Sequence, residues 1–287
     1  MKLPRLGSLW MLVAGLFFAI MGVLVKIGAQ KFSSAELVFY RSFISLIFVY
    51  SMIRYQGWSI KTPLLGKQVL RSVLGFTSLL LFFYAISHLP LATAITLNYT
   101  SPLFMATAIP FMLHEKPRRI LILAILIGFT GVVLLLKPSL HMEELIAGSL
   151  GLLSGAMAGV IYVHVTQLGR AGEPDWRTVF YFTLISSIGG ALWMLLHSFH
   201  TVTWQDMPVL VGIGVSSTIA QLAMTRAYRT GTPLVVGSLA YSTVVLSSLF
   251  GIAIWHETLS PDRWLAVGLI ILSGIISIRS NPRQTKI

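Results

Sequence analysis

Long runs without a charged residue dominate the chain, and they restrict it to folds that can lie in a lipid bilayer. Residues 72–114, 178–205 and 230–256 contain no Lys, Arg, Asp or Glu. A helix needs about 20 mostly apolar residues to cross the hydrocarbon core, so the first run holds two spans and each of the others holds one. Charged residues make up 10% of the chain, against about 25% in soluble domains. The sequence therefore predicts a polytopic membrane protein.

Ten such segments are predicted, and each is expected to be a helix. Backbone polar groups cannot face lipid without partners, which leaves only helices or a closed barrel. Barrel strands would alternate apolar and polar residues, whereas these runs are apolar on every side. The expected fold class is therefore an all-α integral membrane protein. The expected helices cover residues 8–28, 34–54, 68–88, 92–113, 118–136, 146–168, 176–197, 208–229, 233–255 and 263–280.

Basic residues lie mostly on one side of the predicted spans, and Arg41 lies inside one. Cytoplasmic loops carry the excess of Lys and Arg, so the richer side is expected to be the cytoplasm, with both termini on it. The expected location is the cytoplasmic (inner) membrane. The poorer side holds Lys26, Lys31, Lys137 and Arg263. The richer side holds sixteen basic residues: Lys2, Arg5, Arg54, Lys61, Lys67, Arg71, Lys116, Arg118, Arg119, Arg170, Arg177, Arg226, Arg229, Arg279, Arg283 and Lys286.

Composition also bears on partners and cofactors. The chain has no cysteine, which excludes disulfides, thiolate metal sites and cysteine nucleophiles. Its net charge of +12 would suggest nucleic acid in a soluble protein. Here the charge lies in loops beside spans, so the expected partner is the lipid bilayer and not nucleic acid. The doublets His114-Glu115 and His256-Glu257 lack the second His of a zinc motif; we expect neither metal nor cofactor. A homodimer is left open.

The chain repeats itself with an offset of about 140 residues. For example, "VFYRSFIS" beginning at Val38 matches "VFYFTLIS" beginning at Val179. The first five predicted helices therefore recur as the last five, in units of residues 1–139 and 140–287. Because each unit has an odd number of spans, similar units must cross the membrane in opposite senses. This predicts an inverted repeat, related by a pseudo-two-fold axis in the membrane plane.

The repeat places a tyrosine in matching motifs within the fourth helix of each unit. The first motif is "TLNYTSPLF", which contains Tyr99, and the second is "SLAYSTVVL", which contains Tyr241. At about 1.5 Å per residue, each tyrosine is expected ~12 Å deep, counted from opposite faces. Transporters built from inverted repeats bind substrate near the midplane. The two hydroxyls are therefore candidate substrate contacts, and a helix–helix hydrogen bond is the structural alternative.

Small residues recur in segments where helices are expected to pack closely. Association between membrane helices depends on van der Waals contact, which glycine allows by removing the side chain. Gly15, Gly22, Gly155 and Gly159 are expected to have this role.

Four segments carry a family pattern: "FFAIMGVLVK" at the end of the first helix, "ELVFYRSFISL" in the second, "FYAISHLPLATAITLNYTSPLF" across the third and fourth, and "TRAYRTGTPLVVGSLAYSTVVLSSLFGIAIWHE" in the second unit. In these segments the chain resembles drug/metabolite transporters of the EamA-domain type, and the resemblance covers essentially its whole length. It implies a ten-helix transporter of small metabolites, with a central cavity lined mainly by helices one, three, four, six, eight and nine. It does not indicate the substrate.

Further polar residues within the predicted spans complete a candidate site. Lys26 and Arg41 lie toward the outer face, and a charge inside the membrane usually faces a cavity or a partner. The alternatives are snorkelling to the interface, or pairing of Arg41 with Glu36. Tyr84 and Gln221 are included because the resemblance places their helices at the cavity. The full substrate-binding set is Lys26, Arg41, Tyr84, Asn98, Tyr99, Gln221 and Tyr241.

The leading interpretation is a secondary transporter that moves a small metabolite across the cytoplasmic membrane by alternating access. Lys26 and Arg41 have no basic counterparts in the second unit, so the cargo is expected to be amino-acid-like, or another zwitterionic or anionic organic compound. An integral-membrane enzyme is one alternative, but no cluster of acids, histidines or a nucleophile with its base is found. A channel or scramblase is another, but no filter loop or charged ring is visible. No enzymatic activity is expected.

Overall fold

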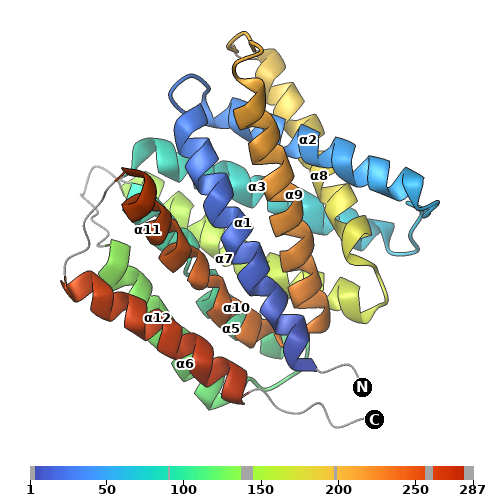
Figure 1. Cartoon of the computed structure of the whole chain (residues 1–287). Coiled ribbons are helices and arrows are strands. Elements are labelled where there is room, and N and C mark those ends of the chain that lie inside the picture. The colour runs from blue at the N-terminus through green and yellow to red at the C-terminus, as the bar shows by residue number, and fades with distance from the viewer. Residues whose placement is uncertain (1–3, 90, 137–144, 197–198, 256–260, 281–287) are drawn as a thin grey trace.

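The computed structural model describes residues 4–89, 91–136, 145–196, 199–255 and 261–280, and every regular element in these ranges is an α-helix (Figure 1). The predicted all-α class agrees with this. In chain order the helices are α1 Pro4–Gly28, α2 Ser34–Tyr55, α3 Leu65–His88, α4 Leu91–Asn98, α5 Ser101–Met112, α6 Arg119–Leu136, α7 Leu145–Arg170, α8 Asp175–Leu196, α9 Met207–Thr230, α10 Pro233–Ala240, α11 Ser242–Trp255 and α12 Pro261–Ser280.

Within the described ranges, nine helical stretches are long and apolar enough to cross a membrane, judged by length and composition. The segment expected at 92–113 is not one of them: two residues, Tyr99 and Thr100, separate α4 from α5, and each of these helices is too short to count alone. The segment expected at 233–255 is divided too, into α10 and α11, but it still counts as one stretch, Pro233–Ile254. The number of ten crossings stays a prediction.

Both interruptions fall at the repeated tyrosine motifs. α4 ends one residue before Tyr99, and Tyr241 itself separates α10 from α11. Pro102 explains the first interruption, because a proline has no N–H and its ring crowds the carbonyl four residues earlier. At the second interruption, Val244 stands at the position that matches Pro102. Its N–H donates to the Tyr241 carbonyl at 3.1 Å. The repeated motif thus marks the same irregularity in both halves, with a proline in only one of them.

The helices of the two halves interleave instead of forming two separate bundles. α1 packs along α9, and α3 packs along α7. α2 packs on α8, and α6 packs on α12. The divided helix α4–α5 lies against α7, while α10–α11 lies against α1. The main packing contacts therefore join the first half of the chain to the second half.

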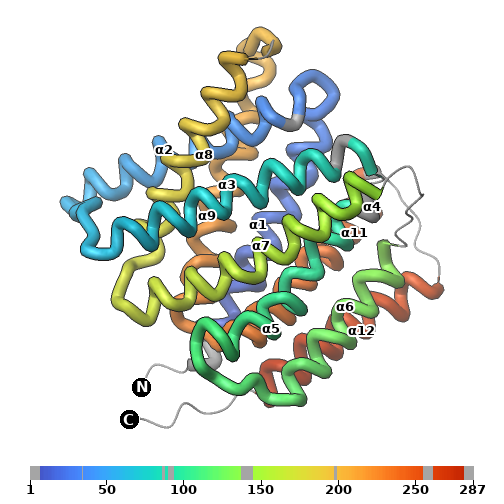
Figure 2. Tube along the Cα trace, turned by 180° about the vertical axis from the view of Figure 1, so that it is seen from behind, coloured from blue at the N-terminus to red at the C-terminus, as the bar shows by residue number. Residues whose placement is uncertain are grey.

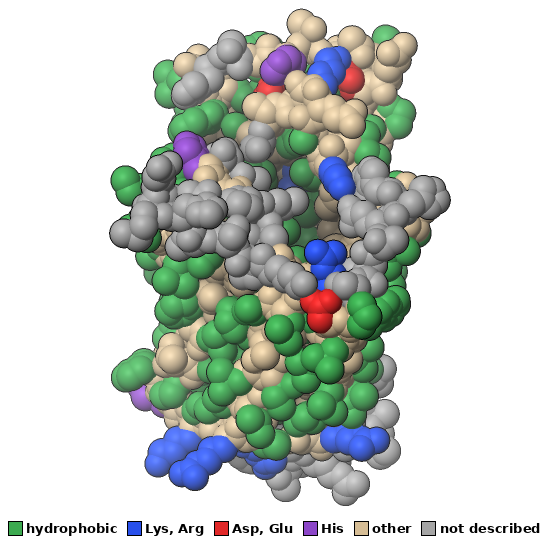
Figure 3. Space-filling model, turned by 90° about the vertical axis from the view of Figure 1, so that its left-hand side faces the viewer, with side chains coloured by type: hydrophobic (Ala, Val, Ile, Leu, Met, Phe, Trp, Pro, Cys, Tyr) green, Lys and Arg blue, Asp and Glu red, His purple; other side chains and the backbone are tan. Residues whose placement is uncertain are grey.

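The pairs α2–α8 and α6–α12 lie at opposite edges of the molecule, with the remaining helices between them (Figures 1 and 2). Both ends of the described chain lie at the same end of the bundle (Figure 1). Figure 3 shows Lys and Arg side chains gathered along the lower end, below a broad belt of hydrophobic side chains. This distribution suits a bundle embedded in a bilayer, with charged loops at its ends.

Glycines set how closely several helices approach. A Cβ at Gly155 or Gly159 of α7 would lie 2.5 Å or 2.7 Å from a backbone carbonyl oxygen of the α4–α5 segment. At Gly15 of α1, a Cβ would lie 2.9 Å from the Ser242 hydroxyl. These three glycines have the expected packing role. The expectation is wrong for Gly22, because a Cβ there would have no neighbouring atom within 4 Å.

Candidate central binding site

Four tyrosine rings meet inside the bundle, each from a different segment. The ring centroids of Tyr99 and Tyr241, at the two helix interruptions, lie 6.1 Å apart. Tyr162 of α7 stacks on Tyr228 of α9 with centroids 4.7 Å apart and 11° between the ring planes. Tyr228 also lies within electrostatic range of Tyr99 and Tyr241. The two pairs therefore form one group, here named the tyrosine cluster.

α9 presents a polar face to this cluster. Gln221, Thr225 and Tyr228 are spaced four and three residues apart, which places them on one side of a helix. Their exposed fractions are 5%, 1% and 0%. Polar side chains buried in a membrane helix face the bundle interior or a water-filled cavity. The spacing in the sequence thus builds a polar stripe that faces inward.

Several hydroxyls in and beside the tyrosine cluster are buried and have no hydrogen-bond partner within the described residues. They belong to Thr225, Tyr228, Tyr241 and Ser242. Buried polar groups in proteins are normally paired, and water supplies the partner when the protein does not. The described residues therefore leave the hydrogen-bonding capacity of these four hydroxyls unused.

Two arginines give this region a positive charge. Arg41 of α2 is partly buried, and Arg71 of α3 is 2% exposed. Both lie within electrostatic range of Tyr162. Among the residues that the structure describes, neither arginine forms an ion pair with a carboxylate. The positive charge beside the cluster is therefore not neutralised by the described part of the chain.

Arg71, Tyr162 and Tyr228 are absent from the set predicted from sequence. Arg71 was counted among the loop charges that set the topology, whereas α3 begins at Leu65 and carries Arg71 almost two turns into the helix. One signal could have identified it, because Arg71 immediately precedes a long uncharged run and follows Lys67 by one helical turn. Nothing in the local pattern singles out the two tyrosines, since their stacking joins residues far apart in the chain.

Three of the predicted residues lie at or beside the tyrosine cluster with identifiable partners. The side chain of Thr243 in α11 forms a hydrogen bond with Tyr99, which is the structural alternative considered for this tyrosine. Asn98 donates through Nδ2 to the Ser154 hydroxyl of α7 at 3.3 Å. The Tyr241 ring packs so closely on Gly128 of α6 that a Cβ there would lie 2.5 Å from it.

Two other predicted residues lie apart from the tyrosine cluster. Lys26 is exposed in the last turn of α1. Tyr84 of α3 is 41% exposed, and its ring stacks on His88 with centroids 4.1 Å apart. The structure thus does not bring these two side chains together with Tyr99, Gln221 and Tyr241.

Glu36 does not pair with Arg41. Its carboxylate, 2% exposed, accepts the Ser33 N–H at 2.7 Å and lies 3.1 Å from Nδ1 of His200. Nearby, Lys31 donates to Asp206. These contacts connect the loop between α1 and α2 to the segment that precedes α9, and we name the four residues Lys31, Glu36, His200 and Asp206 the first clamp.

A second clamp holds the opposite end of the α2–α8 pair. Glu173, just before α8, accepts hydrogen bonds from Thr62 and from Gln68, the latter at 3.0 Å. Arg177 of α8 reaches the same carboxylate at 3.2 Å. The second clamp therefore connects the loop between α2 and α3 to the start of α8. The two clamps involve corresponding connections of the two halves.

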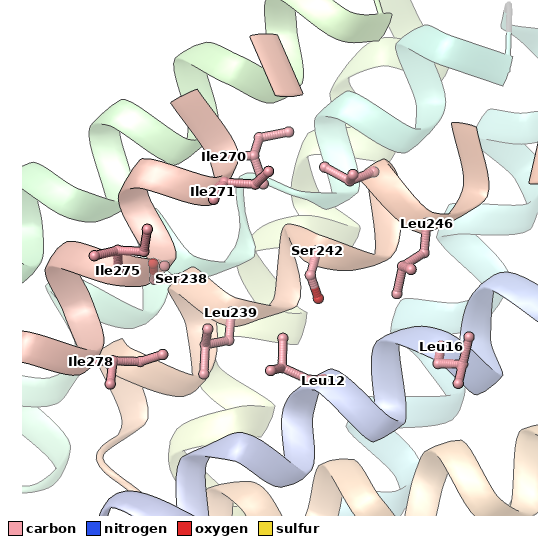
Figure 4. Close-up of a pocket in the computed structure, with 12 residues that line it drawn as sticks. Leu12, Leu16, Ser238, Leu239, Ser242, Leu246, Ile270, Ile271, Ile275 and Ile278 are labelled. Atoms are coloured by element: carbon pink, nitrogen blue, oxygen red, sulfur yellow. The ribbon is translucent and has the colours of Figure 1, made fainter. Parts of the chain in front are cut away.

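One cavity is lined by none of the four tyrosines, although Ser242 beside Tyr241 borders it. It is an apolar groove of about 440 Å³ between α1, α10, α11 and α12, lined mostly by Leu and Ile, with the hydroxyls of Ser238 and Ser242 (Figure 4). Leu12 and Ile271 on its rim are 39% and 54% exposed. The groove opens on the lateral surface of the bundle, where a bilayer would supply acyl chains. Within the described residues, no group of three or more His, Cys, Asp and Glu could hold a metal ion.

Comparisons with known proteins agree with this architecture. The model of the EamA-like transporter family matches residues 5–137 and 145–279. The pseudopaline exporter of Pseudomonas aeruginosa (strain UCBPP-PA14) is 28% identical over 97% of each chain. The riboflavin transporter of Vibrio cholerae is 27% identical over 94% of this chain and 92% of its own. A solved crystal structure matches 94% of this chain and 96% of its own with a TM-score of 0.84 at 20% identity, which shows a shared fold.

Proposed function

Because the chain belongs to the EamA-like transporter family, we propose that it is a secondary transporter that carries a small organic molecule by alternating access through the centre of the bundle. Multi-pass insertion in a membrane and small-molecule transport follow from the apolar helices and from the names of the relatives. Those names concern different molecules, so the cargo of this chain has to be inferred from its own side chains.

Two features support the proposed inverted repeat of residues 1–139 and 140–287. The helix pairings are preserved when α1–α6 are exchanged with α7–α12: α1–α9 becomes α7–α3, and α5–α7 becomes α11–α1. The interruptions at Tyr99 and Tyr241 also correspond. In this proposal the chain crosses the membrane ten times, with α4–α5 and α10–α11 each serving as one interrupted crossing. Interrupted helices are typical of substrate sites in such transporters.

The tyrosine cluster, with its unpaired buried hydroxyls, is the observation on which the proposed site depends. Arg41 adds positive charge beside it, and Gln221 and Asn98 add amide groups. A zwitterionic or anionic organic compound with an apolar or flat part suits this combination, because the arginine binds the anion and the rings contact the rest. Lys26 is assigned to the outer entrance, and Tyr84 is left out because its ring lies against His88.

Transport is tested first by comparing metabolites in cells with and without the gene, and then by flux in proteoliposomes. A carrier saturates and shows counterflow, whereas a channel does neither and an enzyme changes the compound. Absence of both saturation and counterflow with the identified metabolite would reject alternating access. The inner-membrane location and the cytoplasmic termini proposed from the loop charges are independent of this result.

Binding is tested with Arg41→Ala and Tyr99→Phe, using Arg54→Ala as a control, because Arg54 is exposed in the last turn of α2. Loss of a charge-assisted hydrogen bond costs about 1.5–3 kcal/mol, so Arg41→Ala should weaken substrate affinity by roughly 10- to 100-fold. Tyr99→Phe should have a smaller effect, because it removes only a hydroxyl. Affinity and thermal stability are measured together. If Arg41→Ala binds like the parent but melts much earlier, Arg41 has a structural role.

A further inference from the structure

Arg71 is a buried arginine whose guanidinium group is incompletely paired. Its side chain is 2% exposed, and neither Nε nor Nη1 has a hydrogen-bond partner within the described residues. The guanidinium carbon lies 4.4 Å from the centre of the Phe182 ring of α8. Contact with an aromatic face orients a guanidinium group, but it leaves the in-plane N–H donors available for another ligand.

Within the described residues, the surroundings leave room for this group and supply no carboxylate that pairs with it. Gly75 lies one turn after Arg71, and a Cβ there would lie 3.0 Å from the Phe182 ring and 3.8 Å from Nη1 of Arg71. Glu173, which contacts Gln68 in the first turn of the same helix, is already engaged by Thr62, Gln68 and Arg177. A charge buried in a membrane protein is normally paired or faces an aqueous pathway.

Two further described groups near Arg71 are not acidic either. Tyr162 of α7 and His164 of the same helix lie within its electrostatic range, and Arg41 lies within range of the same tyrosine. Arg41 and Arg71 therefore approach Tyr162 together, and Tyr162 stacks on Tyr228. Two cations beside a stacked aromatic pair suit a ligand that joins an anionic group to an apolar part.

We propose that Arg71 is a substrate-binding residue that holds a carboxylate of the transported molecule, with Arg41 as its second cation and the Tyr162–Tyr228 pair contacting the adjoining part. This inference rests on the proposed transport function and names the charged group of its cargo. The planar fork of an arginine donates two parallel hydrogen bonds to a carboxylate. Without cargo, the buried charge of Arg71 carries a desolvation cost, and a bound carboxylate offsets this cost.

The first measurement needs no known cargo. Purified Arg71→Met keeps an extended side chain of similar length over Phe182 and removes the charge, so its melting temperature without ligand should equal or exceed that of the parent. Arg54→Met, which changes an exposed arginine, serves as the control for loss of one charge. If Arg71→Met melts about 4 °C or more below both proteins, Arg71 has a structural partner and the proposal is overturned.

The second measurement uses defined probes: amino acids, succinate and citrate, each compared with its amide. At millimolar concentration, at least one free acid should raise the melting temperature of the parent and of Arg54→Met by about 2 °C or more. Its amide should give a smaller shift, Arg71→Met should give none, and Arg71→Lys should give a partial shift. Equal shifts with acids and amides, an unchanged shift in Arg71→Met, or no shift with any acid in the parent would overturn the carboxylate assignment.

Transport separates this inference from the proposed function. Cells expressing Arg71→Met should lose the metabolite difference that the parent produces. If the variant produces the same difference as the parent, the transporter function stands and the role of Arg71 is rejected. If the parent produces no difference and no flux, the proposed function fails, whatever the melting temperatures show.

Discussion

At the scale of single residues, glycines determine how closely the helices of the two halves approach. Gly159 of α7 stands where a Cβ would lie 2.7 Å and 2.8 Å from backbone atoms of α5. Backbone atoms cannot rotate away as a flexible side chain can, so any added group must separate the two helices. Gly22 of α1 faces open space instead. The same residue type therefore has a packing role at one position and none at the other.

This difference gives a matched pair of variants. Gly159→Ala should destabilise the protein by about 1–3 kcal/mol, because overpacking forces the helices apart. Gly22→Ala should be neutral or slightly stabilising, since alanine is the better helix former by about 0.5–1 kcal/mol. Thermal unfolding in detergent compares the two. Equal melting temperatures for both variants would show that α7 and α5 are less closely packed than the structure indicates.

At the scale of elements, the two clamps connect the ends of α2 and α8 to neighbouring loops. In the first clamp, Asp206 accepts hydrogen bonds from Lys31 and from the N–H and hydroxyl of Thr203. These contacts, with the one from Lys31 the largest, lower the pKa of Asp206 to about 2. A carboxyl group with a lowered pKa stabilises the folded state above its unfolded pKa of about 4, and this contribution is lost as the pH falls through the folded pKa.

The contacts of Asp206 in the first clamp should therefore weaken as the pH falls from about 4 toward 2. Asp206→Asn is expected to melt below the parent at pH 7, because the neutral amide oxygen accepts only a weaker hydrogen bond from Lys31 and loses the ion pair. The gap between the two melting curves should narrow as the pH is lowered from about 4 toward 2, where Asp206 of the parent becomes protonated. Parallel melting temperatures across pH 7 to pH 3 would contradict the prediction, as would a gap that widens in acid.

At the scale of the whole molecule, the interleaved helices mean that neither half has a core of its own. The main partners of α1, α3 and α2 are α9, α7 and α8, so a single unit would expose the faces that its counterpart covers. The two repeats that the family model matches, residues 5–137 and 145–279, thus share one packed body.

Separate expression tests this sharing. Fragments 1–139 and 140–287 should each fail to give a monodisperse monomer, whereas co-expression should yield a complex the size of the intact chain. The reason is that each fragment keeps few of the helix contacts seen in the full protein. Size-exclusion chromatography in detergent, with the intact chain as reference, provides the measurement. A folded monomer of either fragment with a cooperative melting transition would show that the halves are independent.

The sequence by itself determined the environment, the approximate helix bounds, the repeat and the family. Hydrophobicity and loop charge are properties of short segments, so they are readable without a structure. The matched motifs around Tyr99 and Tyr241 also pointed to corresponding positions in the two halves, where both helices are interrupted. Pro102 gave a local reason for only one of these interruptions.

Only the tertiary structure decided which polar residues face one another. Lipid and protein interior are equally apolar to a membrane helix, so its sequence carries little periodicity to show the buried face. Lys26 and Arg71 both lie near the end of a helix, and only the packing of α3 against α7 and α8 buries the second of them. The stack of Tyr162 on Tyr228 likewise depends on where α7 meets α9. Such contacts arise between distant segments, and no local pattern encodes them.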